Sequence, residues 1–505
     1  MSDSPVRSPD GSGALTADQG IPSSVKVVLG VLVFTAFVMM LNETTLAVAL
    51  PAIMVDYAIT AATAQWLLTG FMLTMAIVLP ATGWMLERFA TRSVFVFATA
   101  TFLLGTVIAA LAPSFALLLV SRVAQAIGTA VIMPLLMTVA MTLVPAHRRG
   151  AVMGMIAVVM AVGPALGPTV AGLVLTFTSW HGIFWCMVPL VATAAILGAV
   201  KLTDISERRT TPFDLLSVIL SVFAFGGLVY GVSSIGVIIE GSESAGAAMV
   251  ILIIGLVALA LFVWRQLVRG RREQALLDLR PLAVRNFTIS LIVLMSLMGA
   301  LIGVMSTLPL YLQGSLLASA LVSGLVLLPG GLLEGVLSPI FGRFFDRHGP
   351  RPLIIPGLVL VMGSLFWLAT VTETTRLWQV VTTHVIFSVG LAALFTPLMT
   401  TALGSLPRPL YGHGSAILNT LTQLAAAAGT ASMITIYSTV NRSAIAAGTP
   451  ETTAIATGAK TAFLAAAVVA VVALVLSAFI TRLPSEDPPE QDELIEIDLS
   501  DKPVE

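Results

Sequence analysis

The chain has 505 residues, of which 57% are hydrophobic and only 10% are charged, and its formal net charge is −1. Soluble domains carry about a quarter charged residues, so this composition excludes a soluble protein with an ordinary polar surface, and the balanced charge indicates no nucleic-acid partner. Cys186 is the only cysteine, which excludes an internal disulfide and a cysteine metal cluster and favours a packed thiol.

The chain begins with residues 1–25, which are rich in Ser, Asp, Gly and Pro and have no basic stretch typical of a signal peptide. We expect this segment to be a disordered cytoplasmic tail. The apolar runs that follow are long enough to cross a hydrocarbon core of roughly 30 Å, which takes about 20 residues. The predicted spans are Val27–Leu50, Gln65–Trp84, Val94–Ala112, Phe115–Val144, Ala151–Phe177, Ile183–Val200, Phe213–Ile235, Ala247–Leu267, Phe287–Leu312, Leu321–Phe341, Leu353–Val371, Trp378–Leu403, Ser415–Val440 and Ala462–Ile480.

Basic residues predict the orientation of these fourteen spans, because cytoplasmic loops are enriched in Arg and Lys. With a cytoplasmic N-terminus, eighteen basic residues fall in inside loops, and only Arg376, Arg442 and Lys460 fall outside. Both termini are therefore predicted to be cytoplasmic.

A ten-residue pattern occurs twice, as GWMLERFATR from Gly83 to Arg92 and as GRFFDRHGPR from Gly342 to Arg351. If the seventh and eighth spans are set aside, both copies connect the second and third helices of a six-helix unit. The predicted fold is therefore an all-α integral membrane protein with two six-helix bundles, at 26–200 and 286–483. Two extra helices with a basic linker occupy 201–285, and an acidic disordered tail occupies 484–505. Parallel repeats of this kind are typical of transporters, with the substrate path between the halves.

The repeated pattern has a mechanical interpretation. Its glycines are expected to end their helices and allow close approach of a neighbour. Its acids are expected either to pair with loop arginines or to face a helix N-terminus, where negative charge is favoured. Such contacts on one side of the membrane could hold that side shut; the alternative is a purely orienting role for the charges. The predicted gate residues are Gly83, Glu87, Arg88, Arg92, Gly342, Asp346, Arg347 and Arg351.

Four ionisable residues lie well inside the spans: Glu43, Arg122, Glu334 and His384. A charge at a helix centre costs about 2.5–3.5 kcal/mol on insertion scales, so each is expected to face a cavity or a partner. Glu43 and Arg122 share a depth, which allows an ion pair; Glu43 then either carries the coupling proton or forms a fixed structural pair. Glu334 is either a second coupling or substrate-facing carboxylate or a water-lined structural group. For His384, a packed, hydrogen-bonded side chain is favoured over a cavity residue.

The fifth span reads GMIAVVMAVGPALGPTVAGLVL and combines Gly163 and Gly167 with Pro164 and Pro168. Glycines four residues apart allow another helix to approach closely, and prolines remove backbone donors and bend a helix. This density predicts a hinge or a tight seal.

The chain resembles the major facilitator superfamily, and within it the fourteen-helix drug:proton antiporters, over essentially all of residues 27–480. The resemblance is carried by the two loop patterns, by Leu41-Asn42-Glu43-Thr44 through Ala49-Leu50-Pro51, by Arg122-Val123-Ala124-Gln125-Ala126-Ile127-Gly128, by Gly163 to Pro168 and by Gly414, Ser415, Asn419 and Gln423. The family's first-helix Asp falls at Asn42, and the acid here is Glu43, about 100° further around the helix.

This resemblance implies a proton-coupled antiporter in a bacterial-type inner membrane that exports amphipathic drugs or toxic compounds by alternating access. Proton coupling is assigned to Glu43, Arg122 and Glu334. The substrate cavity is expected to involve Asn42, Gln125, His384, Asn419 and Gln423.

The expected partners are a small-molecule substrate, protons and membrane lipids, and the protein is expected to be a monomer without cofactor or metal. The alternative in the same class is an exporter of one endogenous metabolite or lipid. A polytopic membrane enzyme is a distant alternative, because the outer loops hold mostly isolated charges and no zinc-protease or P-loop motif occurs.

Overall fold

The computed structural model describes residues 22–481, except Thr60, Gln65, 203–213, 240–244 and 272–273. All regular secondary structure in these residues is helical. The two tails predicted to be disordered lie almost entirely outside the described residues, as does most of the connection after the sixth predicted span. The long helices are α1 (Ser23–Asp56), α3 (Trp66–Arg88), α4 (Thr91–Ala110), α5 (Phe115–Leu143), α6 (Arg149–Phe177), α7 (His181–Lys201), α8 (Leu215–Ser233), α10 (Ala245–Gly270), α11 (Arg285–Gly314), α12 (Ala320–His348), α13 (Arg351–Leu368), α14 (Leu377–Gly404), α15 (Tyr411–Ala446) and α16 (Glu451–Ser477). The short elements are α2 (Ala61–Ala64), α9 (Ile235–Ile239) and the 3₁₀ turns Ala146–Arg148, Arg280–Ala283 and Arg408–Leu410.

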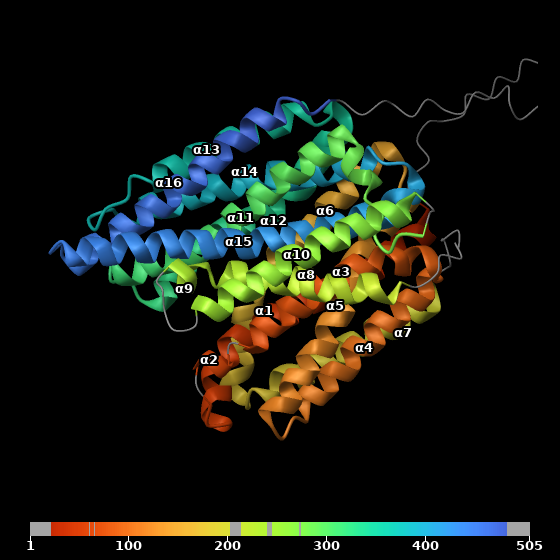
Figure 1. Cartoon of the computed structure of the whole chain (residues 1–505), viewed down its shortest axis with the longest axis horizontal. Helices are drawn as coiled ribbons and strands as arrows, with labels where there is room; N and C mark the ends of the chain where they lie inside the picture. The colour runs from red at the N-terminus through yellow and green to blue at the C-terminus, as the bar shows by residue number, and fades with distance from the viewer. Residues whose placement is uncertain are drawn as a thin grey trace, which may run out of the picture.

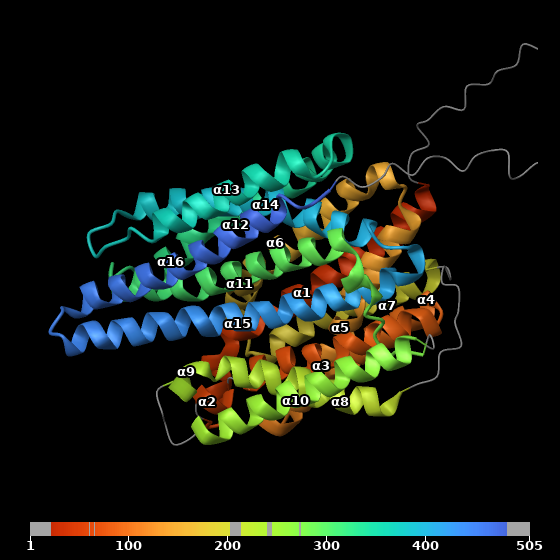
Figure 2. The same ribbon diagram turned by 45° about the horizontal axis from the view of Figure 1, so that its top comes forward.

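Each predicted apolar run corresponds to one of these long helices. Twelve of the described helices are long and apolar enough to cross a membrane. The other two long helices, α6 and α15, lie among the twelve, and α6 packs against both α1 and α12. The helices run roughly along a common direction (Figures 1 and 2).

The ends of two helices differ from the prediction that Gly83 and Gly342 terminate them. That prediction is wrong, because α3 continues to Arg88 and α12 continues to His348. α12 instead ends at Gly349, whose φ of 77° is accessible to glycine at little cost and stops the helix. The two pattern glycines therefore lie in the last turns of their helices, where a neighbouring helix can pack on them.

The helices α1 and α3–α7 form an N-terminal half, and α11–α16 form a C-terminal half. Between the halves, the packed pairs include α6 with α12, α3 with α15, α5 with α15 and α6 with α14. We call the end of the molecule that carries the α3–α4 and α12–α13 connections the basic end. The ribbons of the two halves meet at this end, on the right of Figure 1, whereas at the left the ends of α15 and α16 project away from α2.

The helices α8 and α10 form a separate hairpin that packs on this frame. They cross at Gly227 and Gly255, where a Cβ on either glycine would overlap the backbone of the other helix. The hairpin lies beside α3 and α15 (Figure 2), and α8 contacts both. The inserted helices therefore cover the seam between the two halves.

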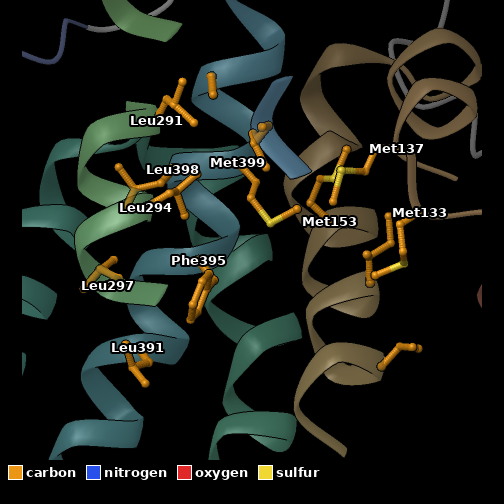
Figure 3. Close-up of a cluster of buried hydrophobic side chains, with 14 of the residues drawn as sticks. Met133, Met137, Met153, Leu291, Leu294, Leu297, Leu391, Phe395, Leu398 and Met399 are labelled. Carbon is orange, nitrogen blue, oxygen red and sulfur yellow. The ribbon is translucent and has the colours of Figure 1, made fainter. Parts of the chain in front are cut away.

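Buried apolar side chains fill the junction of the halves towards the basic end. Figure 3 shows Met399 of α14 pointing toward Met137 and Met153, which come from α5 and α6. All three methionines are almost fully buried. Because methionine is unbranched and flexible, this junction can adapt its packing as the halves move.

Candidate gate and buried polar site

The second copy of the repeated pattern brings Asp346 to the beginning of α6. One carboxylate oxygen accepts a hydrogen bond from the backbone N–H of Gly150 (2.7 Å), and the other accepts one from Ala151 (2.8 Å). The first N–H groups of a helix have no partner within the helix, and the helix dipole favours negative charge there. Of the two arrangements left open by the sequence, Asp346 therefore adopts the one that faces a helix N-terminus.

Two glycines allow this contact. A Cβ on Gly342 would overlap the carbonyl group of Gly150, and a Cβ on Gly150 would overlap the Asp346 carboxylate and the Gly342 carbonyl oxygen. One turn further along α6, Gly154 lies against the backbone of Ser338 and Pro339. The two helices thus touch backbone to backbone at the basic end, and any side chain at these positions would force them apart.

The first copy of the pattern makes the equivalent contact with different chemistry. His413, in the first turn of α15, lies against Gly83, and its Nε2 is 3.1 Å from the Glu87 carboxylate. The His413 side chain is only 3% exposed. Each copy therefore reaches from the second helix of one half to the beginning of the fifth helix of the other half.

His413 was not among the residues predicted from the sequence. It lies outside the apolar core of its span, so a search for ionisable groups inside spans passes over it. The available signal was its position directly before Gly414, the first residue of the pattern noted for that span.

The arginines of the two patterns are less engaged than the acids. Arg351 donates from Nε to the carbonyl oxygen of Ile480 (3.4 Å). Arg92 and Arg347 are exposed, and Arg88 is half-buried. These positions suit contact with solvent and lipid headgroups at the basic end.

Within the membrane region, Arg122 is completely buried in the N-terminal half. It donates to the side-chain oxygen of Gln125 (2.7 Å) and to the backbone oxygen of Leu67 (3.3 Å), and its guanidinium lies over the Phe71 ring at 4.2 Å. Gln125 in turn donates to the hydroxyl of Thr106 (3.0 Å). One guanidinium nitrogen, Nη2, has no hydrogen-bond partner among the described residues.

Glu43 and Asn42 are neighbours on α1. Glu43 forms no ion pair with Arg122 within 4.0 Å in the described part of the chain, and its Oε2 has no hydrogen-bond partner there. Both polar atoms of the Asn42 side chain are likewise buried without a partner in the same region. The structure thus does not contain the fixed pair considered as an alternative for Glu43. Buried polar groups without partners are costly, so groups of this kind are candidates for contact with water, a proton or a ligand.

The helix α6 lies between the two membrane-embedded acids. Its Gly163 packs against Met40 of α1, and its Gly167 packs against Thr44, the residue after Glu43. On the C-terminal side, Val162 of α6 lies against Gly335, the residue after Glu334 on α12. The helix is continuous through this region, while the side chains of Pro164 and Pro168 fall outside what the structure describes. A movement of α6 would therefore change the surroundings of both acids.

His384 occupies in α14 the place that Arg122 occupies in α5, the eighth residue of the fourth helix of its half. It is fully buried and stacks on Phe387, with ring centroids 6.3 Å apart. Within 3.5 Å neither ring nitrogen has a hydrogen-bond partner in the described residues, but the ring interacts with the backbone of Leu327 in α12. The expectation of a packed, hydrogen-bonded histidine therefore stays a prediction. Its ring lies over Gly330 of α12, one turn before the half-buried Glu334.

Asn419 and Gln423 of α15 are both half-buried. Asn419 donates to Met137 Sδ of α5 (3.3 Å), and the hydroxyl of Ser415 lies 3.1 Å from that of Thr138. These contacts join the two halves on the side of the basic end. A cavity of about 250 Å³ lies elsewhere, at the α13–α14 connection, where it is lined by threonines and Trp367 and includes none of the predicted site residues.

Comparison with known proteins places this arrangement in a family. The sequence model of the Major Facilitator Superfamily matches residues 32–430 of the chain. The chain belongs to this superfamily. The lincomycin resistance protein LmrB of Bacillus subtilis (strain 168) is 40% identical to this superfamily member over 462 residues, which cover 90% of this chain and 95% of LmrB. A multidrug resistance protein B homolog of Mycobacterium tuberculosis (strain H37Rv) is 28% identical over 409 residues, which cover 80% of this chain and 74% of that protein.

Solved structures support the same fold. A double-tryptophan mutant of XylE aligns with a TM-score of 0.65 at 14% identity, over 91% of this chain and 97% of XylE. The human organic anion transporter MFSD10 aligns with a TM-score of 0.59 at 14% identity, over 88% and 99% of the two chains. The predicted all-α major-facilitator fold is therefore confirmed, and this superfamily member is a multi-pass membrane transporter rather than an enzyme.

Proposed function

We propose that this transporter exports amphipathic, drug-like compounds across a bacterial-type inner membrane in exchange for protons. All fourteen long helices then cross the membrane, both termini are cytoplasmic and the basic end faces the cytoplasm. The relatives include a lincomycin resistance protein and a multidrug resistance protein B homolog, which supports this substrate class. The observation that carries the proposal is the presence of Glu43 beside α6: it is a membrane-embedded acid with one carboxylate oxygen that has no hydrogen-bond partner in the described part of the chain.

The two gate contacts and the two acids suggest a cycle. Asp346, bound to the N-terminus of α6, and Glu87, bound to His413 of α15, hold the cytoplasmic side closed. In this state Glu43 and Glu334 are open to protonation from the outside. Protonation removes the negative charge beside α6, which lowers the cost of rearranging that helix in a low-dielectric setting. An inward proton gains about 1.4 kcal/mol per pH unit and about 2.3 kcal/mol per 100 mV, which is sufficient to drive export.

Everted membrane vesicles with an imposed pH gradient test this proposal. Ethidium and lincomycin are the transported probes, and Glu43→Gln and Glu334→Gln are the test variants. We expect Glu43→Gln to lose gradient-driven transport of both probes and Glu334→Gln to reduce it. The matched control is Asp56→Asn, because Asp56 is an exposed carboxylate whose contact with Trp180 lies within the N-terminal half.

If both glutamine variants keep gradient-driven transport, the assignment of proton coupling to these acids is wrong. If the wild-type protein moves neither probe although it is inserted and folded, the exporter of a single endogenous metabolite becomes the better interpretation.

A further inference from the structure

We propose that the inserted hairpin α8–α10 stabilises the closed basic end, and that Gln266 is the positioning residue through which it acts on His413. This inference rests on the gate role given above to the contact between His413 and Glu87. It assigns a purpose to two helices that lie outside the six-plus-six repeat.

The hairpin has a rigid anchor at Asp214, the N-cap of α8. Its side chain is 3% exposed and accepts two hydrogen bonds from Arg265, both at 2.9 Å. It also forms an ion pair with Arg269 at 3.0 Å. Burial raises the pKa of Asp214, but the hydrogen bonds from Arg265 and Ser217 and the charge of Arg269 outweigh this effect and lower the pKa to about 2. The anchor is therefore ionised at any physiological pH.

Gln266 of α10 connects this anchor to the linker that follows the hairpin. Its amide nitrogen donates to Ser217 Oγ (2.7 Å), and Ser217 Oγ donates to Asp214 (2.6 Å). Its amide oxygen accepts the backbone N–H groups of Leu276 (2.9 Å) and Leu277 (3.2 Å). Gln266 is only 1% exposed, so these groups cannot exchange this partner for water without a local opening.

The next residue of the linker completes the connection. The backbone N–H of Asp278 donates to Nδ1 of His413 (3.3 Å). A nitrogen that accepts a hydrogen bond carries no proton, so the network assigns the proton to Nε2. Nε2 is the nitrogen that faces the Glu87 carboxylate at 3.1 Å. The linker therefore holds His413 in the tautomer that donates to Glu87.

The position of the hairpin agrees with this role. Helix α8 contacts α3, which carries Glu87, and α15, which carries His413. These two helices belong to opposite halves, and they must separate at the basic end when that end opens. The hairpin contacts both helices and orients the His413 side chain between them, so its position allows it to control how readily α3 and α15 separate.

The experiment measures the basic end directly, in purified full-length protein without substrate or proton gradient. Cys186 is replaced by Ser, and spin labels are attached to cysteines at Ser93 and Arg408, which are exposed at the basic end in opposite halves. Gln266→Met has nearly the same volume but makes none of the three hydrogen bonds. We expect it to raise the ratio of open to closed basic ends about tenfold. Gln266→Glu retains an acceptor for Leu276 and Leu277 and should restore most of the closed population.

Two further measurements separate positioning from a general loss of packing. Gln313→Met, at an exposed glutamine on α11, is the matched control and should leave the distances unchanged. In a Glu87→Gln background, Gln266→Met should have less than half of its effect, because the group on which it acts through His413 has lost its charge. Nitrogen-15 spectra of labelled histidine should show His413 leaving its single tautomer in Gln266→Met.

An unchanged distance distribution in folded Gln266→Met, or an equal effect in the presence and absence of the Glu87 charge, would overturn the inference. If Gln266→Met does not fold, the spectra and distances of Gln266→Glu and Ser217→Ala are used instead. A single His413 tautomer and a closed basic end in Gln266→Glu support the inference. The inference is overturned if Gln266→Glu opens the basic end and Ser217→Ala opens it to the same extent. Because the measurement uses no transport, failure of proton coupling at Glu43 leaves its result intact.

Discussion

Asparagine at position 346 is the sharpest perturbation of the proposed gate, because it keeps the shape of Asp346 and removes its charge. The aspartate accepts two backbone hydrogen bonds, from Gly150 and Ala151, at the N-terminus of α6. Asparagine offers one oxygen and one NH₂ group, so one of these two N–H groups would face a donor instead of an acceptor. The variant therefore loses one charge-assisted hydrogen bond and the interaction of a full charge with the helix dipole.

The magnitude follows from these two losses. A hydrogen bond to a charged group contributes about 1.5–3 kcal/mol, and a charge at a helix N-terminus contributes about 0.3–1 kcal/mol. Since Asp346 is half-buried and water can replace part of the lost interaction, we expect the closed basic end to lose about 2 kcal/mol, which changes the ratio of open to closed states about 30-fold.

The distance between spin labels at Ser93 and Arg408, in the Cys186→Ser background, measures this ratio. We expect Asp346→Asn to populate a longer distance that the parent protein lacks, and Asp56→Asn to leave the distribution unchanged. The reasoning is refuted if Asp346→Asn keeps the parent distribution while circular dichroism shows an intact helical fold. It is also refuted if Asp56→Asn opens the basic end to the same extent, since the hydrogen bond that Asp56 accepts from Trp180 lies within its own half.

Three other predictions concern the Glu87–His413 contact, the packing of α6 on α1 and the anchor of the hairpin. In a double-mutant cycle of Glu87→Gln and His413→Gln, we expect a coupling energy of about 1 kcal/mol in the open-to-closed ratio, a value typical of one hydrogen bond, and additive effects would contradict the contact. Gly167→Val should abolish ethidium efflux, because even a Cβ at this position overlaps the Thr44 side chain, whereas Gly172→Val has open space and should retain efflux in the same assay. Asp214→Asn should lower efflux without moving the pH midpoint of efflux between pH 5 and 8. The pKa of Asp214 is lowered to about 2 in the folded protein, below its value of about 3.9 in the unfolded chain. The ionised carboxylate therefore stabilises the fold at all pH values above about 3.9, and this stabilisation is lost only as the pH falls towards 2.

The helices could be predicted from the sequence because each span is an apolar run of the length that a bilayer requires. Their ends were harder, and α16 shows why. The predicted span begins at Ala462, but the helix begins at Glu451, because a Thr-rich turn and Lys460 lower the hydropathy of residues that are nevertheless helical. There Gly458 packs on the backbone of Tyr437 in α15, a contact between two helices that hydropathy does not register.

The candidate site divides in the same way. Glu43, Arg122, Glu334 and His384 could be identified because a charged or ionisable side chain in an apolar run is rare and costly. His413 and Gln266 carry no such signal. Their importance comes from their partners in the folded chain: Glu87 of the other half for His413, and the backbone of Leu276, beyond the end of α10, for Gln266. No local pattern specifies those partners.

The two copies of the repeated pattern are therefore alike in sequence, but their contacts differ in how well they tolerate substitution of the partner residues. Asp346 binds backbone N–H groups, which only proline at position 150 or 151 would remove, although bulk at Gly150 can block them. Glu87 binds a single imidazole, so its contact depends on the identity, tautomer and orientation of His413. A contact made by one side chain needs support from its surroundings, and the inserted hairpin supplies this support on the side of the molecule where the weaker copy lies. The C-terminal copy has no equivalent need, because the backbone of α6 already fixes its donors in the direction that Asp346 requires.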